Sequence, residues 1–266
     1  MKTMQYLRRA AYFIVWALCM ASVHSLSAQV HVGLDNYFNQ ETNAKGQPYH
    51  YLWTDEAASG FSRWGKIFQQ QGAVLQTLHE APNAANLKKL GIYIIVDPDT
   101  TTENPHPHYI STADIHAIMR WVKAGGVLVL LANDAGNCEF THLNLLAANF
   151  GMYFNPVSFN KVTGENWEMG AITPLPDHPV FKDVSKIYMK EVSTFALSAP
   201  AISVVEKEGN ILMAESHVGK GFVFAVGDPW IYNEYIDHDH LPASFQNHEA
   251  AVNLSNYLIA QAKKDH

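Results

Sequence analysis

The chain has 266 residues, 48% of them hydrophobic, and a formal net charge of −7 at pH 7. This apolar content is sufficient for a packed core. The acidic balance and the lack of any basic run argue against nucleic-acid binding, which requires clustered Lys and Arg to neutralise phosphates.

The first 28 residues have the pattern of a secretory signal peptide. Lys2, Arg8 and Arg9 precede an apolar run, and small residues lead up to Ala28. We expect cleavage there and a periplasmic or secreted protein with no membrane span in its mature form. Residues 29–266 are then expected to form a single domain.

Strand and helix patterns alternate over the first half of this domain. The runs at 91–96 and 127–131 are apolar throughout, as strands covered on both faces are. The helical segments carry apolar residues at helical spacing. Such alternation predicts an α/β, flavodoxin-like, three-layer fold. The expected strands are 30–34, 73–78, 91–96 and 127–131, and the expected helices are 55–71, 83–89, 111–124 and 140–150.

The second half has a different pattern. Residues 153–210 are rich in turn-forming residues, which predicts short antiparallel or edge strands. Gly219-Lys220-Gly221 forms a turn before a strongly apolar strand. The expected strands are 187–192, 202–205, 211–215 and 222–226, and a last helix is expected over 243–262.

Several segments resemble a known superfamily. Gly125-Gly126 before a strand, Asp177-His178-Pro179-Val180-Phe181, and Val218-Gly219-Lys220-Gly221 leading to Gly227-Asp228 resemble the trehalose-utilisation-type, class I glutamine amidotransferase-like superfamily. The resemblance implies a mostly parallel sheet with helices on both faces. Cys138 lies several residues beyond its strand and outside any Gly-x-Cys-x-Gly elbow, so amidotransferase chemistry is not expected.

Four other segments resemble a bacterial domain found with unsaturated glucuronyl or rhamnogalacturonyl hydrolases, similar to the oligosaccharide dehydratases of ulvan breakdown. The resemblance implies removal of water from a non-reducing-end uronic acid of an acidic oligosaccharide. The product is a 4,5-unsaturated uronate, which an unsaturated glucuronyl hydrolase would cleave as a partner enzyme. The four segments are Asp35–Asn39, Gly46–Trp53, Asp97–Thr100 and Gly227–Tyr235.

Polar clusters follow four of the predicted strands, at 35–39, 97–100, 133–142 and 227–235. Ligands bind outside the carboxyl ends of strands in open parallel sheets, so these clusters predict the site. Dehydration needs a base, an acid and groups that stabilise the carboxylate. The candidate catalytic residues are His142, His50, Tyr232, Asp134 and Glu139, and the candidate substrate-binding residues are Asn36, Tyr49, Trp53, Arg63, Asn133, Asn137, Trp230, Asn233 and Glu234.

Other interpretations stay open. Each Asn or Asp could simply form a turn or cap a helix. A non-catalytic sugar-binding module would use Trp53 and Trp230 as aromatic platforms, and a degenerate amidotransferase-like structural domain would need none of these residues. His106-Pro107-His108, Asp97 with Asp99, and Asp237-His238-Asp239-His240 lack a third ligand at a recognised spacing. We therefore expect no metal and no cofactor.

Overall fold

The structure is a computed structural model, and it describes residues 29–236 and 240–264. The predicted signal peptide, residues 1–28, lies outside the described residues, as does most of the cluster at 237–240. Within the described ranges, no helix is both long and apolar enough to cross a membrane.

Helices and strands alternate up to residue 150, and strands dominate from there to residue 226. In chain order the elements are β1 (His31–Asp35), α2 (Ser62–Gln70), β2 (Val74–Leu78), α3 (Ala84–Leu87), β3 (Ile92–Val96), α4 (Thr112–Lys123), β4 (Val127–Leu131), α5 (Phe140–Ala147), η1 (Ala148–Phe150), β5 (Met152–Phe159), η2 (Trp167–Gly170), β6 (Ala171–Ile172), η3 (Pro179–Phe181), β7 (Ile187–Tyr188), β8 (Val192–Leu197), β9 (Ile202–Lys207), β10 (Asn210–Val218), β11 (Gly221–Val226), α6 (Asn233–Ile236) and α7 (Asn247–Ala262).

Nine strands form one mixed sheet, whose main path has the order β2-β1-β3-β4-β11-β10-β8-β5, with β9 paired to β10. The strands from β2 to β11 along this path run parallel to their neighbours. Strands β10, β8, β5 and β9 extend the sheet in antiparallel pairs. The α/β fold predicted from the alternating pattern is therefore confirmed.

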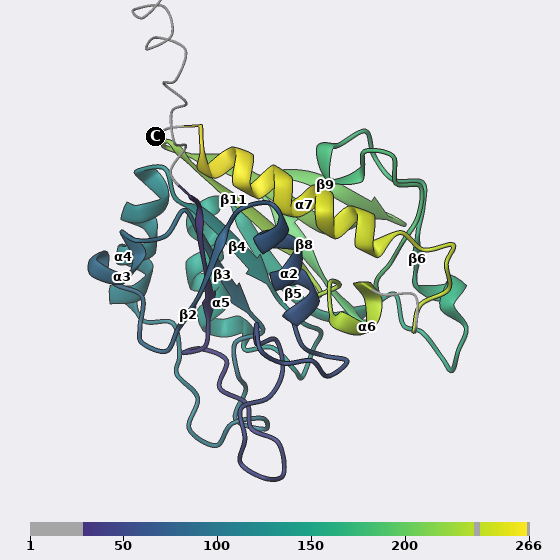
Figure 1. The fold of residues 1–266 in the computed structure, drawn as a ribbon, viewed down its shortest axis with the longest axis horizontal. Helices are drawn as coiled ribbons and strands as arrows, with labels where there is room; N and C mark the ends of the chain where they lie inside the picture. Colours follow the sequence, from purple (N-terminus) through teal and green to yellow (C-terminus); the bar gives the residue numbers. More distant parts are fainter. Residues whose placement is uncertain (1–28, 237–239, 265–266) are drawn as a thin grey trace, which may run out of the picture.

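Helices cover both faces of the sheet (Figure 1), with α2 and α7 on one face and α4 and α5 on the other. Because successive side chains of a strand point to opposite faces, a fully apolar strand contributes to two cores. In β3, Ile92, Ile94 and Val96 pack on the side of α2 and α7, whereas Tyr93 and Ile95 pack on the side of α4 and α5.

Several elements differ from their predictions. The strand predicted over 187–192 is interrupted, with β7 ending at Tyr188 and β8 beginning at Val192, and the helix predicted over 243–262 begins at Asn247. The helix predicted over 55–71 begins only at Ser62, because residues 52–61 fold into a loop closed by hydrogen bonds from Asp55 and Phe61 N–H to the Leu52 carbonyl. A side chain at Gly60 would lie 2.0 Å from the Asp55 carbonyl oxygen, so this loop needs glycine there. Strand β5 was not predicted, because its sequence includes Pro156 and it is an edge strand paired only with β8.

Candidate functional site

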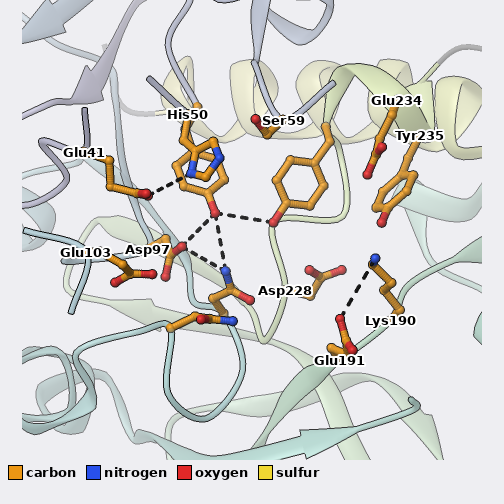
Figure 2. A pocket seen from close by; sticks show the side chains of 14 residues that line it. Glu41, His50, Ser59, Asp97, Glu103, Lys190, Glu191, Asp228, Glu234 and Tyr235 are labelled. Carbon is orange, nitrogen blue, oxygen red and sulfur yellow. Dashed lines mark hydrogen bonds and ion pairs between the residues drawn. The ribbon is translucent and has the colours of Figure 1, made fainter. Parts of the chain in front are cut away.

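A pocket of about 300 Å³ lies at the carboxyl ends of three neighbouring parallel strands. Asp97 follows β3, Asn133 follows β4 after one residue, and Asp228 follows β11 after one residue. Figure 2 shows the side chains directed into this space from the strand ends and from loops above them. The lining residues are Glu41, His50, Tyr51, Ser59, Asp97, Glu103, Asn133, Asn137, Lys190, Glu191, Asp228, Tyr232, Glu234 and Tyr235.

Asp97 is at the centre of a hydrogen-bond network on the pocket floor. Its Oδ2 accepts a hydrogen bond from the Tyr51 hydroxyl at 2.7 Å and one from Asn133 Nδ2 at 2.9 Å. The hydroxyl of Tyr51 lies 3.4 Å from that of Tyr232, which extends the network across the pocket. Asp97 Oδ1 is buried and has no hydrogen-bond partner in the described part of the chain. One carboxylate oxygen is therefore held in place while the other is left free.

Burial controls the protonation of this network. It raises the pKa of the Asp97 carboxyl well above its usual range, although the hydrogen bonds from Asn133 and Tyr51 act in the opposite direction. Burial likewise raises the pKa of Asp228, against the opposing charge of Lys190. The pKa values of the Tyr51 and Tyr232 hydroxyls are also raised, first by burial and then by nearby carboxylates. Both tyrosines therefore stay protonated, and their hydroxyl groups can donate hydrogen bonds.

His50 reaches the pocket from the loop after β1. Its Nδ1 lies 2.9 Å from Glu41 Oε1, and its ring stacks on Tyr49. When Nδ1 carries a proton and donates it to Glu41, Nε2 is the basic nitrogen. A carboxylate that orients an imidazole in this way fixes the tautomer and supports proton transfer from a substrate.

Strained backbone positions concentrate at this pocket. Non-glycine residues rarely adopt positive φ, and such strain is found most often at functional sites. In the described part of the chain seven non-glycine residues have positive φ, and four of them line the pocket: His50 at 62°, Tyr51 at 52°, Asp97 at 42° and Glu191 at 52°. The loops therefore hold these side chains in positions that relaxed backbone would not favour.

The position of Asp228 depends on close packing of the backbone at the preceding residue. Gly227 precedes it, and a Cβ at Gly227 would lie 1.7 Å from the Ser193 carbonyl oxygen. The absence of a side chain lets β11 approach β8 at this point, where the Ser193 N–H donates a hydrogen bond to the Gly227 carbonyl. Asp228 is consequently 3% exposed, and its Oδ2 has no hydrogen-bond partner among the described residues.

The pocket gathers five of the residues expected from the sequence, and they come from three different loops. His50 and Tyr232 are candidate acid–base groups. Asn133, Asn137 and Glu234 are candidate binding groups.

The other three candidate catalytic residues lie outside the lining. His142 stacks on Tyr109 with ring centroids 4.7 Å apart, and its Nδ1 lies 3.2 Å from Glu139 Oε2. Glu139 caps α5 by accepting hydrogen bonds from the N–H groups of Thr141 and His142. Asp134 is buried and accepts hydrogen bonds from Asn137 and Ser158. Helix capping and loop closure account for the contacts of Glu139 and Asp134.

Neither tryptophan offers a ring face to the pocket. Trp230 is fully buried in the core beside α7, where Asn247 Nδ2 donates to its carbonyl. The indole N–H of Trp53 donates to the Gln76 carbonyl at 3.0 Å, and its ring packs against the aromatic core of α2. The expectation of aromatic platforms at these positions is thus corrected, because both rings contribute to the hydrophobic core instead.

The remaining candidates have local contacts outside the lining. Asn233 is buried and bonds to the loop before α2, and its Oδ1 accepts from the Arg63 N–H. Asn36 bonds to the Asn39 carbonyl and to His79. Tyr49 contacts two lining residues: its ring lies tilted against that of His50, and its N–H donates to the Glu41 carbonyl.

Several lining residues were missed by sequence reasoning. Glu41 and Glu103 lie in loops after β1 and β3, and Lys190 and Glu191 lie between β7 and β8. Tyr51 was singled out only as a neighbour of His50. The position of Glu41 and Glu103 on carboxyl-end loops was an available signal, whereas nothing in the local sequence places residues 190 and 191 near β3.

Comparisons with known proteins place the fold but not the activity. No family model matches the sequence, and no curated protein matches it. Among solved structures, the N-terminal domain of mmIFT52 is 13% identical, with a TM-score of 0.65, over 86% of this chain and 97% of that chain. The cytoplasmic protein STM1381 from Salmonella typhimurium LT2 is 12% identical, with a TM-score of 0.58, over 87% and 99%.

A ThuA-like protein from Bacteroides uniformis is also among the structural neighbours, at 12% identity and a TM-score of 0.46, over 90% of this chain and 94% of that chain. All three identities are low, so the likenesses concern the fold alone.

Proposed function

We propose that this protein is a carbon–oxygen lyase that removes water from the non-reducing-end uronic acid of an acidic, ulvan-type oligosaccharide. The observation that carries the proposal is the presence, in one pocket, of a carboxylate-oriented histidine and two protonated tyrosines whose hydroxyl groups are hydrogen-bonded. The resemblance of four segments to oligosaccharide dehydratases supplies the substrate class.

His50 acts as the base in this proposal. Its Nε2 removes the proton at C5 of the uronic acid, which the neighbouring carboxyl group acidifies. Glu41, hydrogen-bonded to Nδ1, stabilises the resulting imidazolium and keeps the ring oriented. The proton moves from carbon to nitrogen, and the electron pair of the C5–H bond forms the C4=C5 double bond.

Tyr232 acts as the acid. Its hydroxyl donates a proton to the departing 4-hydroxyl group, which leaves as water. Burial and nearby carboxylates raise the pKa of Tyr232, but its hydrogen bond with Tyr51, 3.4 Å away, acts in the opposite direction and favours the transient tyrosinate. The product is a 4,5-unsaturated uronate, the kind of terminal residue on which unsaturated glucuronyl hydrolases act.

The rival interpretation, a non-catalytic sugar-binding module, has less support. It relied on Trp53 and Trp230, of which Trp230 is buried in the core and Trp53, partly buried, lines a different pocket from the one that holds His50. A binding site also has no need for an oriented histidine beside proton-donating tyrosines.

A direct assay tests the proposal. Purified protein is incubated with oligosaccharides that end in a uronic acid, and the ultraviolet absorbance of the new conjugated double bond is recorded. We expect absorbance to rise with time and a loss of one water to appear by mass spectrometry. Saturable binding of the oligosaccharides with no double bond formed would overturn the lyase proposal in favour of a binding module.

A further inference from the structure

We propose that Glu41, Asp97 and Glu103 form a binding site for a hard divalent cation, with Ca²⁺ as the first candidate. The site itself stands on the geometry of these residues. Its suggested role, to hold the carboxylate of the sugar, rests on the proposed function.

The three carboxyl groups converge from separate segments of the chain. Glu41 comes from the loop after β1, Asp97 from the end of β3 and Glu103 from the loop that follows it. One oxygen atom of each lies within 4.8 Å of the corresponding oxygen of the other two. In Figure 2 the carboxyl group of Asp97 lies between those of Glu41 and Glu103, at one end of the pocket.

An unpartnered, buried oxygen marks the centre of the cluster. Asp97 is 2% exposed, and its Oδ1 accepts no hydrogen bond from any described residue. Its Oδ2 is already held by Tyr51 and Asn133, so the carboxyl group is oriented with one oxygen left for a ligand. A buried polar atom without a partner is costly, and a cation would satisfy it.

The other two carboxylates are oriented as well. Glu103 Oε2 accepts hydrogen bonds from the Thr100 N–H at 3.0 Å and from the Thr100 hydroxyl at 2.8 Å. Glu41 Oε1 is paired with His50 Nδ1. Each of the three groups thus has one oxygen bound by the protein, which fixes the arrangement before any cation arrives.

The charges in the cluster repel one another. Glu41 and Glu103 both act to raise the pKa of Asp97, and Glu41 also raises that of Glu103. Among the described residues, Lys190 is the only Lys or Arg that lines the pocket, and its Nζ lies 4.0 Å from Glu191, outside the cluster. A divalent cation would attract all three carboxylates and would displace any proton bound to them.

The donor set selects the type of cation. All three ligands are carboxylate oxygens, which suit Ca²⁺, Mg²⁺ and Mn²⁺, and no thiolate joins them. Ca²⁺ takes oxygen ligands at about 2.3–2.6 Å, so oxygens on opposite sides of the ion can lie roughly 5 Å apart. Oxygens that all lie within 4.8 Å of one another can share such an ion, and Ca²⁺ is the first candidate because its flexible coordination needs less exact ligand placement than the octahedral shell of Mg²⁺.

A cation here also resolves a difficulty of the proposed reaction. A pocket lined by Glu41, Asp97, Glu103, Glu191, Asp228 and Glu234 would repel a uronate. A cation bound by three of these residues, next to His50, would attract the uronate carboxylate and stabilise the charge that develops on it when the C5 proton leaves.

Calorimetry on the chelator-treated, dialysed protein tests the site. We expect one Ca²⁺ to bind per chain and the thermal midpoint to rise with Ca²⁺ concentration. Glu103→Gln, a change on the partly exposed side of the cluster, should weaken Ca²⁺ binding by about tenfold or more. Glu234→Gln changes a carboxylate of the same pocket outside the cluster, so it should bind Ca²⁺ as the wild type does.

The possible outcomes distinguish failure of the cation site from failure of the proposed lyase reaction. If neither Ca²⁺, Mg²⁺ nor Mn²⁺ saturates the wild type at millimolar concentration, or if Glu103→Gln binds Ca²⁺ as the wild type does, the site is overturned even if the lyase is active. If Ca²⁺ binds as expected but the lyase activity persists in excess chelator, the role as carboxylate anchor is overturned. If Ca²⁺ binds and no elimination occurs, only the proposed function fails.

Discussion

At the residue scale, His50 and His142 both have a carboxylate near Nδ1, but only His50 forms a hydrogen bond with it, and their surroundings differ. Nδ1 of His50 lies 2.9 Å from Glu41, and Nδ1 of His142 lies 3.2 Å from Glu139. Only His50 lines the pocket. What distinguishes them is access to a substrate, since a base must come within hydrogen-bond distance of the proton that it removes.

We therefore expect His50→Ala to lower turnover by about 10²–10⁴-fold, the usual contribution of a general base. His142→Ala is the matched control and should retain turnover within a few-fold. Turnover and oligosaccharide affinity are measured for both variants, and affinity should change little because a base acts mainly in the transition state. If His142→Ala lost activity and His50→Ala kept it, the assignment of the base would be reversed.

Cys138 has the properties of a structural thiol. It is 4% exposed, and burial raises the pKa of its thiol well above the usual range. A nucleophilic cysteine needs the opposite, a lowered pKa and access to the substrate.

Cys138→Ser should consequently keep most of the turnover and lose at most modest stability. Kinetics and circular dichroism on the same preparation check this. A folded Cys138→Ser protein with turnover reduced by orders of magnitude would instead indicate thiol chemistry.

At the scale of elements, Asn233 joins α6 to the loop that precedes α2. Its Nδ2 lies within hydrogen-bond distance of the carbonyls of Asp55 and Ala57 and of the Ser62 hydroxyl, and its Oδ1 accepts from the Arg63 N–H. The first turn of α2 has no side-chain cap at Phe61, so Asn233 supplies an acceptor from outside the helix. A residue expected to bind substrate is thus part of the scaffold that holds the pocket loops.

Asn233→Ala should lower the free energy of unfolding by roughly 2–4 kcal/mol, because it leaves several buried polar groups without partners. Urea denaturation measures this change. Asn253→Ala is the matched control, since its side chain makes one exposed hydrogen bond, to the Lys182 carbonyl, and it should cost less than about 1 kcal/mol. If Asn233→Ala and Asn253→Ala were equally stable, Asn233 would not stabilise the contact between α6 and the loop that precedes α2.

At the scale of the whole molecule, buried carboxyl groups link stability to pH. Burial raises the pKa of Asp35 from 3.8 to about 6, although Tyr93 and three backbone N–H groups oppose the shift. The folded state therefore favours the protonated form more strongly than the unfolded state does. The stability from this group is complete below about pH 4 and is lost as pH rises through 6.

The ionised Asp35 should cost roughly 3 kcal/mol at pH 8, from a pKa difference of about two units. Asp35→Asn removes this cost: its amide oxygen can still accept from the backbone N–H groups, and its amide nitrogen would donate to the Tyr93 hydroxyl oxygen, which now accepts. The gain in unfolding free energy of Asp35→Asn over wild type should thus be larger at pH 8 than at pH 5. Denaturant titrations at the two pH values measure this difference in unfolding free energy. A difference that is the same at both pH values would refute the dependence of stability on Asp35 ionisation.

Much of the element order follows from local patterns. The fully apolar runs of β3, β4 and β11 and the spaced apolar residues of α4 are visible in the sequence, because burial on one or two faces imposes a period on the chain. Boundaries were less predictable where loop contacts compete with helix formation, as between Asp55 and Phe61. The eight-residue edge strand β5 was missed for a different reason, because its exposed residues and Pro156 remove the apolar alternation.

By itself, the sequence determined that this chain builds a parallel α/β sheet and that polar residues follow its strands, because each of these is a property of consecutive residues. Only the tertiary structure decided which polar residues meet. Glu41, Asp97 and Glu103 lie together in the folded chain although they come from separate segments, whereas Trp230 and Asp134 lie outside the pocket lining. The physical reason is that strand order and loop packing set distances between segments, and these depend on contacts across the whole chain that no local pattern records.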